Sequence, residues 1–132
     1  RIQKKKKKSK KFGLKSVLNN KISSFSHKMK QKLFLIASLV TNPQNWILDE
    51  PMVGLDPEAA FTVKEIMRER ANNGKTVFFS THVMEVAEKL CDRIGIIRKG
   101  QLVFVGTMAE LRAQYGSENQ SLEDIFLQLI KE

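Results

Sequence analysis

Trp46-Ile47-Leu48-Asp49-Glu50-Pro51 is the stretch that decides the fold of this chain. A short apolar run that ends in carboxylates is typical of a buried strand in a parallel sheet. Ligands of such sheets bind beyond the carboxyl ends of the strands. Alternation along the strand turns Asp49 and Glu50 in different directions, so the two carboxylates can have different roles. Taken alone, the pair is a weak signal for a ligand site, and a helix-capping or a solvated pair is then the favoured interpretation.

Helical patterns flank this strand on both sides. A helix of about four turns is expected to begin after Ser26, a candidate N-cap, and to end at Asn42-Pro43. Its apolar positions at helical spacing are Met29, Leu33, Ile36, Ala37 and Val40. A second helix is expected from Pro57 to Asn72-Asn73-Gly74. Its inner face is expected to hold Ala60, Val63, Ile66 and Met67.

The alternation of strands and helices continues toward the C-terminus. Strands are expected at 76–79 and 94–97, with a helix between them that begins near Thr81. The order β, α, β, α, β indicates an α/β fold with crossover helices packed on a largely parallel sheet. Lys99-Gly100 is expected to turn the chain into a terminal β-hairpin with 101–105, followed by helices near 107–115 and 121–130.

Length and charge narrow the class of protein. The 132 residues correspond to about one small domain, and the 42% of apolar residues suit a globular chain. The net charge of +9 is a terminal feature, because residues 1–32 hold 13 of the 23 Lys and Arg and no acidic residue. No apolar stretch approaches the ~18–20 residues of a membrane span. Cys91 is the only cysteine, which excludes an internal disulfide and fits a reducing compartment.

The lysine run at 4–8 has two interpretations. Its summed charge could attract phosphates or acidic lipid. A self-repelling, solvated segment is the favoured interpretation, because no aromatic residue interleaves with the lysines. We therefore expect 1–11 to be a basic, disordered segment and 12–25 to be a turn-rich connector. A first residue of Arg rather than Met indicates a piece of a longer protein or a processed product, such as a split-gene or frameshift product.

Three motifs in order carry a resemblance to a known family. The segment 46–51, then Gly54-Leu55-Asp56-Pro57, then Ser80-Thr81-His82 resembles the ATPase domains of ATP-binding cassette (ABC) transporters. Upstream, 25–33 is similar to the signature loop of multidrug and peptide-type exporters. The resemblance covers about 12–132, the C-terminal half of such a domain. It implies a partial P-loop NTPase-like fold, with a parallel sheet core, flanking helices and a terminal β-hairpin.

The resemblance implies roles for individual residues. Asp49 would be the Walker B carboxylate on the magnesium side, and Glu50 the base that activates the hydrolytic water. His82 would be the switch histidine that reaches the γ-phosphate of ATP. Asp56 would belong to the D-loop, which contacts the opposite subunit.

The signature loop implies a site divided between two chains. Ser26 and the amides that follow it, at His27, Lys28 and Met29, would cap the γ-phosphate of ATP bound on a partner subunit, because a helix N-terminus attracts anions. Simpler interpretations stay open: Ser26 as an ordinary N-cap, and His27 as a surface residue. In the same way, Asp56 could only start an Asp-Pro turn, and His82 could only cap a helix.

The sequence also departs from the family. It contains no Gly-x-x-x-x-Gly-Lys-Ser/Thr loop, so the backbone amides and lysine that would cradle the phosphates are missing from it. The aromatic residue that stacks on adenine and the Gln loop are missing too. Lys28 stands where the signature has its second glycine. Its side chain could block close approach of the backbone to phosphate, or it could add a positive charge there.

The resemblance implies a function with partners. We expect part of an ATPase that hydrolyses Mg²⁺·ATP as a head-to-tail dimer with a second ATPase subunit and drives transmembrane permease subunits. Such a protein would be cytoplasmic, at the inner face of the membrane. The isolated chain, without its N-terminal half, is expected to be incompetent. The alternatives are a nucleic-acid or ribosome-associated module that uses the lysine run, although nucleic acid is not an expected partner, and an inactive truncated product.

Overall fold

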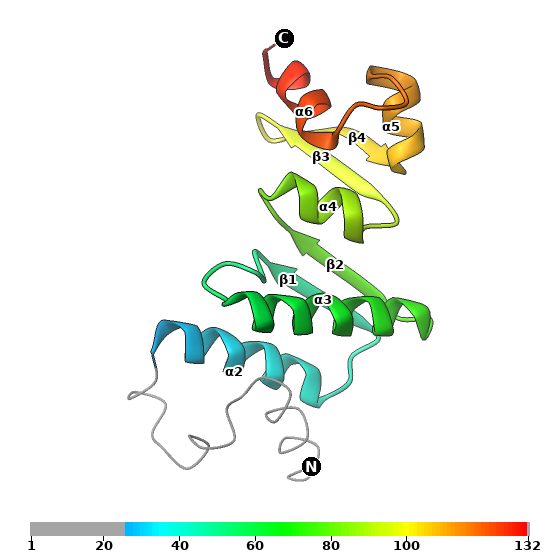
Figure 1. Ribbon diagram of the computed structural model, residues 1–132. Helices are drawn as coiled ribbons and strands as arrows, with labels where there is room; N and C mark the ends of the chain where they lie inside the picture. The colour runs from blue at the N-terminus through cyan, green and yellow to red at the C-terminus, as the bar shows by residue number, and fades with distance from the viewer. Residues whose placement is uncertain (1–25, 132) are drawn as a thin grey trace. The chain divides into compact units, whose positions relative to one another are not determined.

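A computed structural model describes residues 26–131, which fold into two compact units divided after Ser80 (Figure 1). We call residues 26–80 the first unit and 81–131 the second unit. The expected segments at 1–11 and 12–25 lie outside the described residues. The first unit contains α2 (His27–Val40), β1 (Asn45–Asp49), α3 (Pro57–Asn72) and β2 (Thr76–Ser80). The second contains α4 (Met84–Leu90), β3 (Ile94–Arg98), β4 (Gln101–Gly106), α5 (Met108–Tyr115) and α6 (Leu122–Lys131).

The first unit is built on a parallel pair of strands. β1 and β2 run in register from Asn45 opposite Thr76 to Asp49 opposite Ser80. The connection between them is α3, which lies across the pair in Figure 1. Two parallel strands joined by a helix form the expected α/β arrangement.

Both helices of the first unit begin as the sequence predicts. Ser26 is the N-cap of α2 and Asp56 the N-cap of α3, with Pro57 in the first turn. In α2 the buried face is rotated by about one position from the predicted one, whereas in α3 Val63, Ile66 and Met67 are buried as predicted and Ala59 is buried in place of Ala60. In α2 the buried residues are Leu35, Ile36 and Leu39, and in α3 they are Ala59, Val63, Ile66, Met67 and Arg70. Tertiary packing decides which edge of an apolar stripe is covered, and periodicity alone does not.

Trp46 and Arg70 form the centre of the first unit. The Trp46 indole is 2% exposed and donates to Ser38 Oγ at 2.8 Å. The Arg70 guanidinium lies 5.7 Å from the centroid of that ring and donates to Asn42 Oδ1 at 3.2 Å and to the Pro43 carbonyl. Burial lowers the pKa of Arg70 because it removes water from the charge. These contacts fasten α3 and the loop after α2 to β1.

The second unit is built on an antiparallel hairpin. β3 and β4 are joined by Lys99 and Gly100, whose φ angles of 49° and 76° suit a tight hairpin turn. The register shifts between Ile96 and Ile97, which marks a bulge. The strand expected at 94–97 therefore pairs with its sequence neighbour, and in the described residues the parallel sheet contains two strands.

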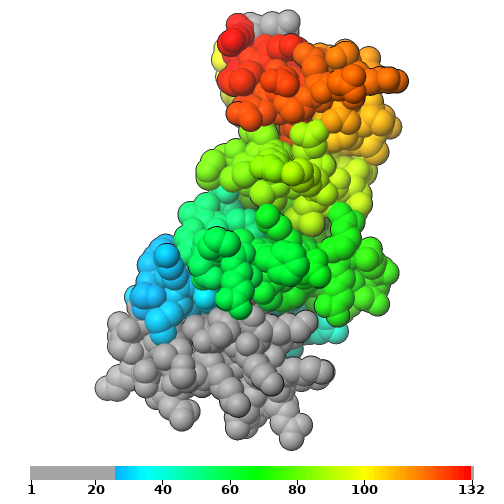
Figure 2. Space-filling view, viewed as in Figure 1, coloured from blue at the N-terminus to red at the C-terminus, as the bar shows by residue number. Residues whose placement is uncertain are grey.

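Helices α5 and α6 cover one face of the hairpin. Their side chains lie together in the space-filling view, α5 in orange and α6 in red (Figure 2). The buried residues of this core are Ile94, Ile96, Phe104, Leu111, Leu122, Ile125 and Leu129. No helix in the described range has the length and apolar character needed to cross a bilayer.

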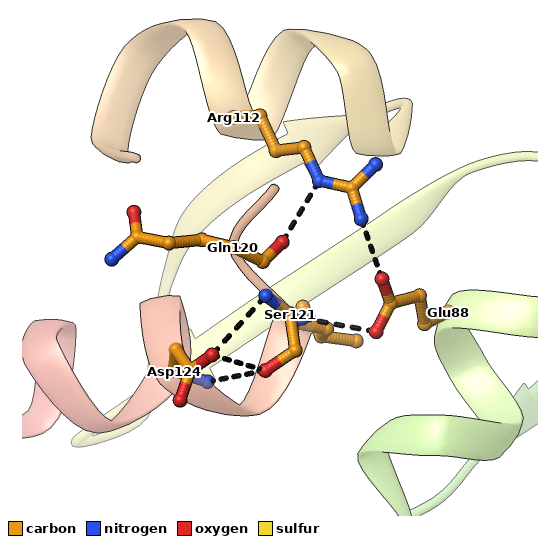
Figure 3. Close-up of polar contacts among 6 residues, drawn as sticks. Glu88, Arg112, Gln120, Ser121 and Asp124 are labelled. Carbon is orange, nitrogen blue, oxygen red and sulfur yellow. Dashed lines mark hydrogen bonds and ion pairs between the residues drawn. The ribbon is translucent and has the colours of Figure 1, made fainter. Parts of the chain in front are cut away.

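A polar clasp joins the three helices of the second unit (Figure 3). The Glu88 carboxylate on α4 accepts from Arg112 Nη2 at 2.6 Å and from the backbone N–H of Leu122 at 3.1 Å. Arg112 Nε donates to the Gln120 carbonyl at 2.9 Å. One carboxylate thus holds α5 through an ion pair and caps the first turn of α6.

Candidate active site

The carboxyl ends of β1 and β2 are tied together by side chains. Asp49 and Ser80 are partners in the strand register, and Ser80 Oγ donates to Asp49 Oδ1. The backbone N–H of Glu50 lies 3.1 Å from Ser80 Oγ and 3.2 Å from the Ser80 carbonyl oxygen. The predicted carboxylates therefore lie at the end of a strand whose neighbour contributes a hydroxyl to the same spot.

Glu50 leaves the strand in an unusual backbone conformation. Its φ is 44°, in the left-handed region that residues with a side chain rarely adopt. Such strain persists only where neighbouring contacts impose it. The hydrogen bonds from the Glu50 N–H to Ser80 are contacts of this kind. They turn the chain sharply between Asp49 and the loop that follows.

The donor atoms at this edge are hard oxygens. Asp49 supplies a carboxylate and Ser80 a hydroxyl, and oxygen ligands suit Mg²⁺. Within residues 26–131 no group of three or more His, Cys, Asp or Glu side chains could enclose a metal ion. Protein-bound Mg²⁺ usually takes one or two carboxylates and fills the other positions with water and substrate phosphates. The donors fit a magnesium-phosphate complex and do not form a complete protein cage.

Asp56 lies at the start of α3 with two partners. Its carboxylate accepts from the Ala59 N–H at 3.2 Å and forms an ion pair with Lys32 on α2 at 2.9 Å. The hydrogen bond from Lys32, followed by that from Ala59, lowers the pKa of Asp56. The simpler interpretation, a helix starter after a turn, is what this geometry displays. Contact of Asp56 with an opposite subunit stays a prediction.

The predicted signature residues lie at the N-terminus of α2. Ser26 Oγ accepts from the Met29 N–H at 3.3 Å, as an N-cap does. Ser26, His27 and Lys28 are exposed and Met29 is half-buried. A side chain at Gly54 would come within 3.6 Å of His27 Cδ2, so this end of α2 lies beside the loop that follows β1. Binding of phosphate by these residues stays a prediction.

His82 is exposed and lies just before α4, in the second unit. The N-cap of α4 is Val83, without a side-chain cap, and Thr81 Oγ1 accepts from the Val83 N–H at 3.0 Å. His82 is therefore not the N-cap of this helix. Its implied role at the γ-phosphate of ATP, where Asp49 and Glu50 of the first unit would also act, stays a prediction.

Comparison with known proteins decides the family. The chain is 40% identical over 108 residues to the ABC-type transporter ATP-binding protein EcsA of Bacillus subtilis (strain 168), a match that covers 82% of this chain and 44% of EcsA. It is 35% identical over 120 residues to the uncharacterized ABC transporter ATP-binding protein YthP of that organism, covering 91% of this chain and 51% of YthP. The chain is a homologue of ABC transporter ATP-binding proteins.

A solved structure of an ATP binding subunit of an ABC transporter has the same fold. It aligns with a TM-score of 0.92 at 31% identity and covers 97% of this chain and 53% of that subunit. No protein-family model matches the sequence. The chain spans about half the length of the curated ABC relatives it matches. The α/β fold class and the family predicted from the motifs are both confirmed.

Three residues of this ABC homologue were not assigned a role from the sequence. Ser80 binds Asp49, Lys32 binds Asp56, and Arg70 packs on Trp46. Strand register could have indicated Ser80, because it directly follows the apolar run that pairs with 46–48. The contacts of Lys32 and Arg70 join different helices and strands, so the local sequence does not indicate them.

Proposed function

We propose that this chain is part of the ATP-hydrolysing subunit of an ABC transporter. The observation that carries the proposal is the hydrogen-bonded pair of Asp49 and Ser80 at neighbouring strand ends, with Glu50 next in the chain. Polar groups at this edge of a parallel sheet are placed where α/β proteins bind ligands. The family relationship supports ATP as that ligand.

Each carboxylate has a separate role in this proposal. Asp49 would hold Mg²⁺, with Ser80 orienting its carboxylate, and the bound metal would neutralise charge on the phosphates of ATP. Glu50 would accept a proton from the attacking water, as a general base does. His82 would donate a hydrogen bond to the γ-phosphate and stabilise charge that develops there.

The complete site would need a second ATPase subunit arranged head to tail. Ser26 and the amides of His27, Lys28 and Met29 would then face the γ-phosphate bound by that partner. Asp56 would lie at the junction, where Lys32 and Ala59 already hold its carboxylate. Permease subunits, and a place on the cytoplasmic face of the membrane, complete the proposal.

ATP hydrolysis by a completed domain tests these roles. The half of EcsA that this chain does not span is joined upstream of it, and kcat and the affinity for ATP are measured separately. Glu50→Gln should lower kcat by ~10²-fold or more and leave ATP affinity unchanged, because general-base catalysis contributes about that much. Glu58→Gln, at an exposed position in the first turn of α3, is the matched control and should leave kcat unchanged. Equal kcat values for the two variants would refute the role of Glu50.

The chain alone gives a second test. Without the glycine-rich phosphate loop it lacks converging backbone donors for the phosphates, and lysines do not replace such a nest. We expect weak or no binding of Mg²⁺·ATP in calorimetry of the isolated chain. Submicromolar affinity would contradict the proposed division of the site.

A further inference from the structure

Helix α4 begins two residues after His82 and lies at the surface of the second unit. Every residue of α4 is at least partly exposed. Its apolar contacts with the core come from Met84, Ala87 and the C-cap Cys91. Glu88 lies four residues after Met84 and three before Cys91, so it shares the side of the helix that faces the core. That side therefore holds one carboxylate among apolar side chains.

Glu88 constrains α4 in a way that the apolar contacts do not. The hydrophobic effect is non-directional, so half-buried apolar side chains stabilise α4 without fixing its rotation. Hydrogen bonds, in contrast, depend on angle and distance. Glu88 Oε1 accepts from Arg112 Nη2 on α5 at 2.6 Å (Figure 3). Glu88 Oε2 accepts from the Leu122 N–H at the start of α6 at 3.1 Å. The two oxygens of one carboxylate thus fix the rotation of α4 against two other helices.

The Arg112 guanidinium is itself held in place. Arg112 Nε donates to the Gln120 carbonyl at 2.9 Å, which ties the side chain to the segment before α6. The side chains of Glu88 and Arg112 are 24% and 29% exposed. Partial burial weakens the screening of the two charges by water, so this ion pair is stronger than a fully exposed one. Glu88 is therefore bound by a partner whose own position is fixed.

The first turn of α4 is joined to His82 by backbone hydrogen bonds. Thr81 Oγ1 accepts from the Val83 N–H at 3.0 Å, which closes a turn around His82. The Val83 carbonyl accepts from the N–H groups of Val86 at 3.0 Å and Ala87 at 3.3 Å. A rotation of α4 would therefore carry the backbone of His82 with it.

We propose that Glu88 is a positioning residue for His82. Its hydrogen bonds to Arg112 and to the Leu122 N–H fix the rotation of α4, and with it the direction in which the His82 imidazole points. The inference rests on the proposed role of His82 at the γ-phosphate of ATP, whereas the positioning itself is measured without nucleotide. Helices α5 and α6 thereby influence hydrolysis through one carboxylate, without contact with ATP.

Histidine NMR of the intact chain measures the effect on His82 directly. The sequence contains two histidines, so selective isotope labelling gives one imidazole signal from His27 in the first unit and one from His82 in the second. Glu88→Ala should shift the amide and imidazole signals of His82 and leave those of His27 unchanged. Glu123→Ala removes an exposed carboxylate from α6 and is the matched control, which should shift neither histidine.

A double-mutant cycle tests whether Glu88 acts through His82. It uses the completed domain, in which the missing half of EcsA is joined upstream of the chain. Glu88→Ala should lower kcat at least several-fold, and by up to ~10²-fold, because a displacement of about 1 Å at a catalytic group can cost that much. ATP affinity should be unchanged, because the phosphate loop is supplied by the EcsA half. In a His82→Ala background, Glu88→Ala should lower kcat no further.

Four outcomes separate positioning from a merely structural role. Unchanged His82 signals in the folded Glu88→Ala chain would overturn the proposal, and so would equal shifts of His27 and His82. An equal loss of kcat with and without His82 would also overturn it. Full kcat in the His82→Ala domain would refute the proposed role of His82, and the nucleotide-free NMR would still decide whether Glu88 positions it. Chemical denaturation verifies that each variant folds, and Glu88→Gln, which keeps the side-chain shape, replaces Glu88→Ala if that variant does not.

Discussion

The two units pair their strands and close their cores in different ways. The first unit pairs strands whose partners are 31 residues apart, and α3 must cross between them before they meet. The second unit pairs neighbouring strands through a tight turn and closes its core locally, with Leu111, Leu122 and Ile125 at most 1% exposed. Residues assigned to chemistry nevertheless lie mainly in the first unit, the one with an open parallel face.

The unit whose core is closed by local contacts is therefore not the unit that holds most of the candidate site residues. An antiparallel hairpin can expose one face to solvent, whereas a parallel pair of strands normally has other elements packed on both of its faces. The β1–β2 pair exposes Ile47 and its register partner Phe78 on one face. The hairpin of the second unit also exposes apolar side chains on its outer face, at Ile97, Leu102 and Val105. The difference is that only the open face of the first unit continues into a carboxylate and a hydroxyl. The incompletely covered face of the β1–β2 pair is thus the face that carries Asp49 and Ser80.

The largest expected effect comes from removing the centre of the first unit. Trp46→Ala deletes a buried indole with its hydrogen bond to Ser38 and its contact with Arg70. Loss of a buried aromatic side chain of this size costs about 3–5 kcal/mol. Hydrogen exchange followed by mass spectrometry should show faster exchange in 26–80 than in the parent chain, with 81–131 unchanged.

Phe61→Ala is the control for that experiment, because it removes an exposed aromatic side chain from the same unit. Its exchange should match that of the parent chain. Equal acceleration of exchange in both units after Trp46→Ala would break the comparison, because it would show that the units unfold together.

The second unit should respond to loss of its polar clasp. Glu88→Ala leaves the Arg112 guanidinium without its carboxylate and the Leu122 N–H without its cap. Half-buried groups left unsatisfied in this way cost about 1–3 kcal/mol. Chemical denaturation should show this loss. Glu85→Ala, which breaks an exposed ion pair with Lys89, is the matched control and should cause no measurable change.

Two glycines offer a paired test of the units. Gly74 and Gly100 have φ angles of 75° and 76°, and a Cβ at either would meet nothing within 4 Å. Alanine at either position therefore costs only the strain of the left-handed backbone, roughly 1–2 kcal/mol. Gly74→Ala should destabilise the first unit alone and Gly100→Ala the second alone. Effects of either variant on both units by hydrogen exchange would contradict this division.

The smallest expected effect is a loss of stability of the second unit at acidic pH. Hydrogen bonds from Thr107 lower the pKa of Glu110 below the ordinary 4.5, and those from Ser121 lower that of Asp124 below 3.8. A carboxyl pKa that is lower in the folded state adds stability above the unfolded pKa, and this is lost as pH falls through the folded value. The second unit should therefore lose stability as pH falls below about 4.5.

Glu110→Gln and Asp124→Asn should each flatten that pH dependence. Glu123→Gln, at an exposed position in the first turn of α6, is the control and should not change it. Denaturant midpoints measured at several pH values give the slopes. A steeper slope in either substituted protein than in the parent chain would contradict the assignment.

The sequence predicted the elements well where the signals are local. Ser26 and Asp56 cap helices, Lys99-Gly100 turns the hairpin, and Thr107 begins α5, because each uses its own neighbours. The family could also be predicted, since the order of three short motifs does not depend on packing. The expected sheet placed Asp49 and Ser80 at the carboxyl ends of two strands, but it did not predict the hydrogen bond between them.

Other features required the folded chain. Burial of Arg70 depends on an aromatic ring and a loop more than 20 residues away in the sequence, so no local pattern indicates it. The hairpin of the third expected strand with its sequence neighbour was predicted, because a tight turn brings the two strands together at little entropic cost. The sequence did not predict that, in the described residues, this strand does not pair with β1 or β2. The place of His82 relative to Asp49 depends on both units, and no local pattern specifies it.

The sequence contains one tryptophan and one tyrosine, and each unit holds one of them. Trp46 lies in the centre of the first, and Tyr115 packs edge-on against Phe104 in the second, with ring centroids 6.2 Å apart. Each unit therefore carries its own intrinsic fluorophore, with separate emission bands and no added dye. Coincident melting of the two signals would indicate one cooperative transition, and separate melting would indicate two.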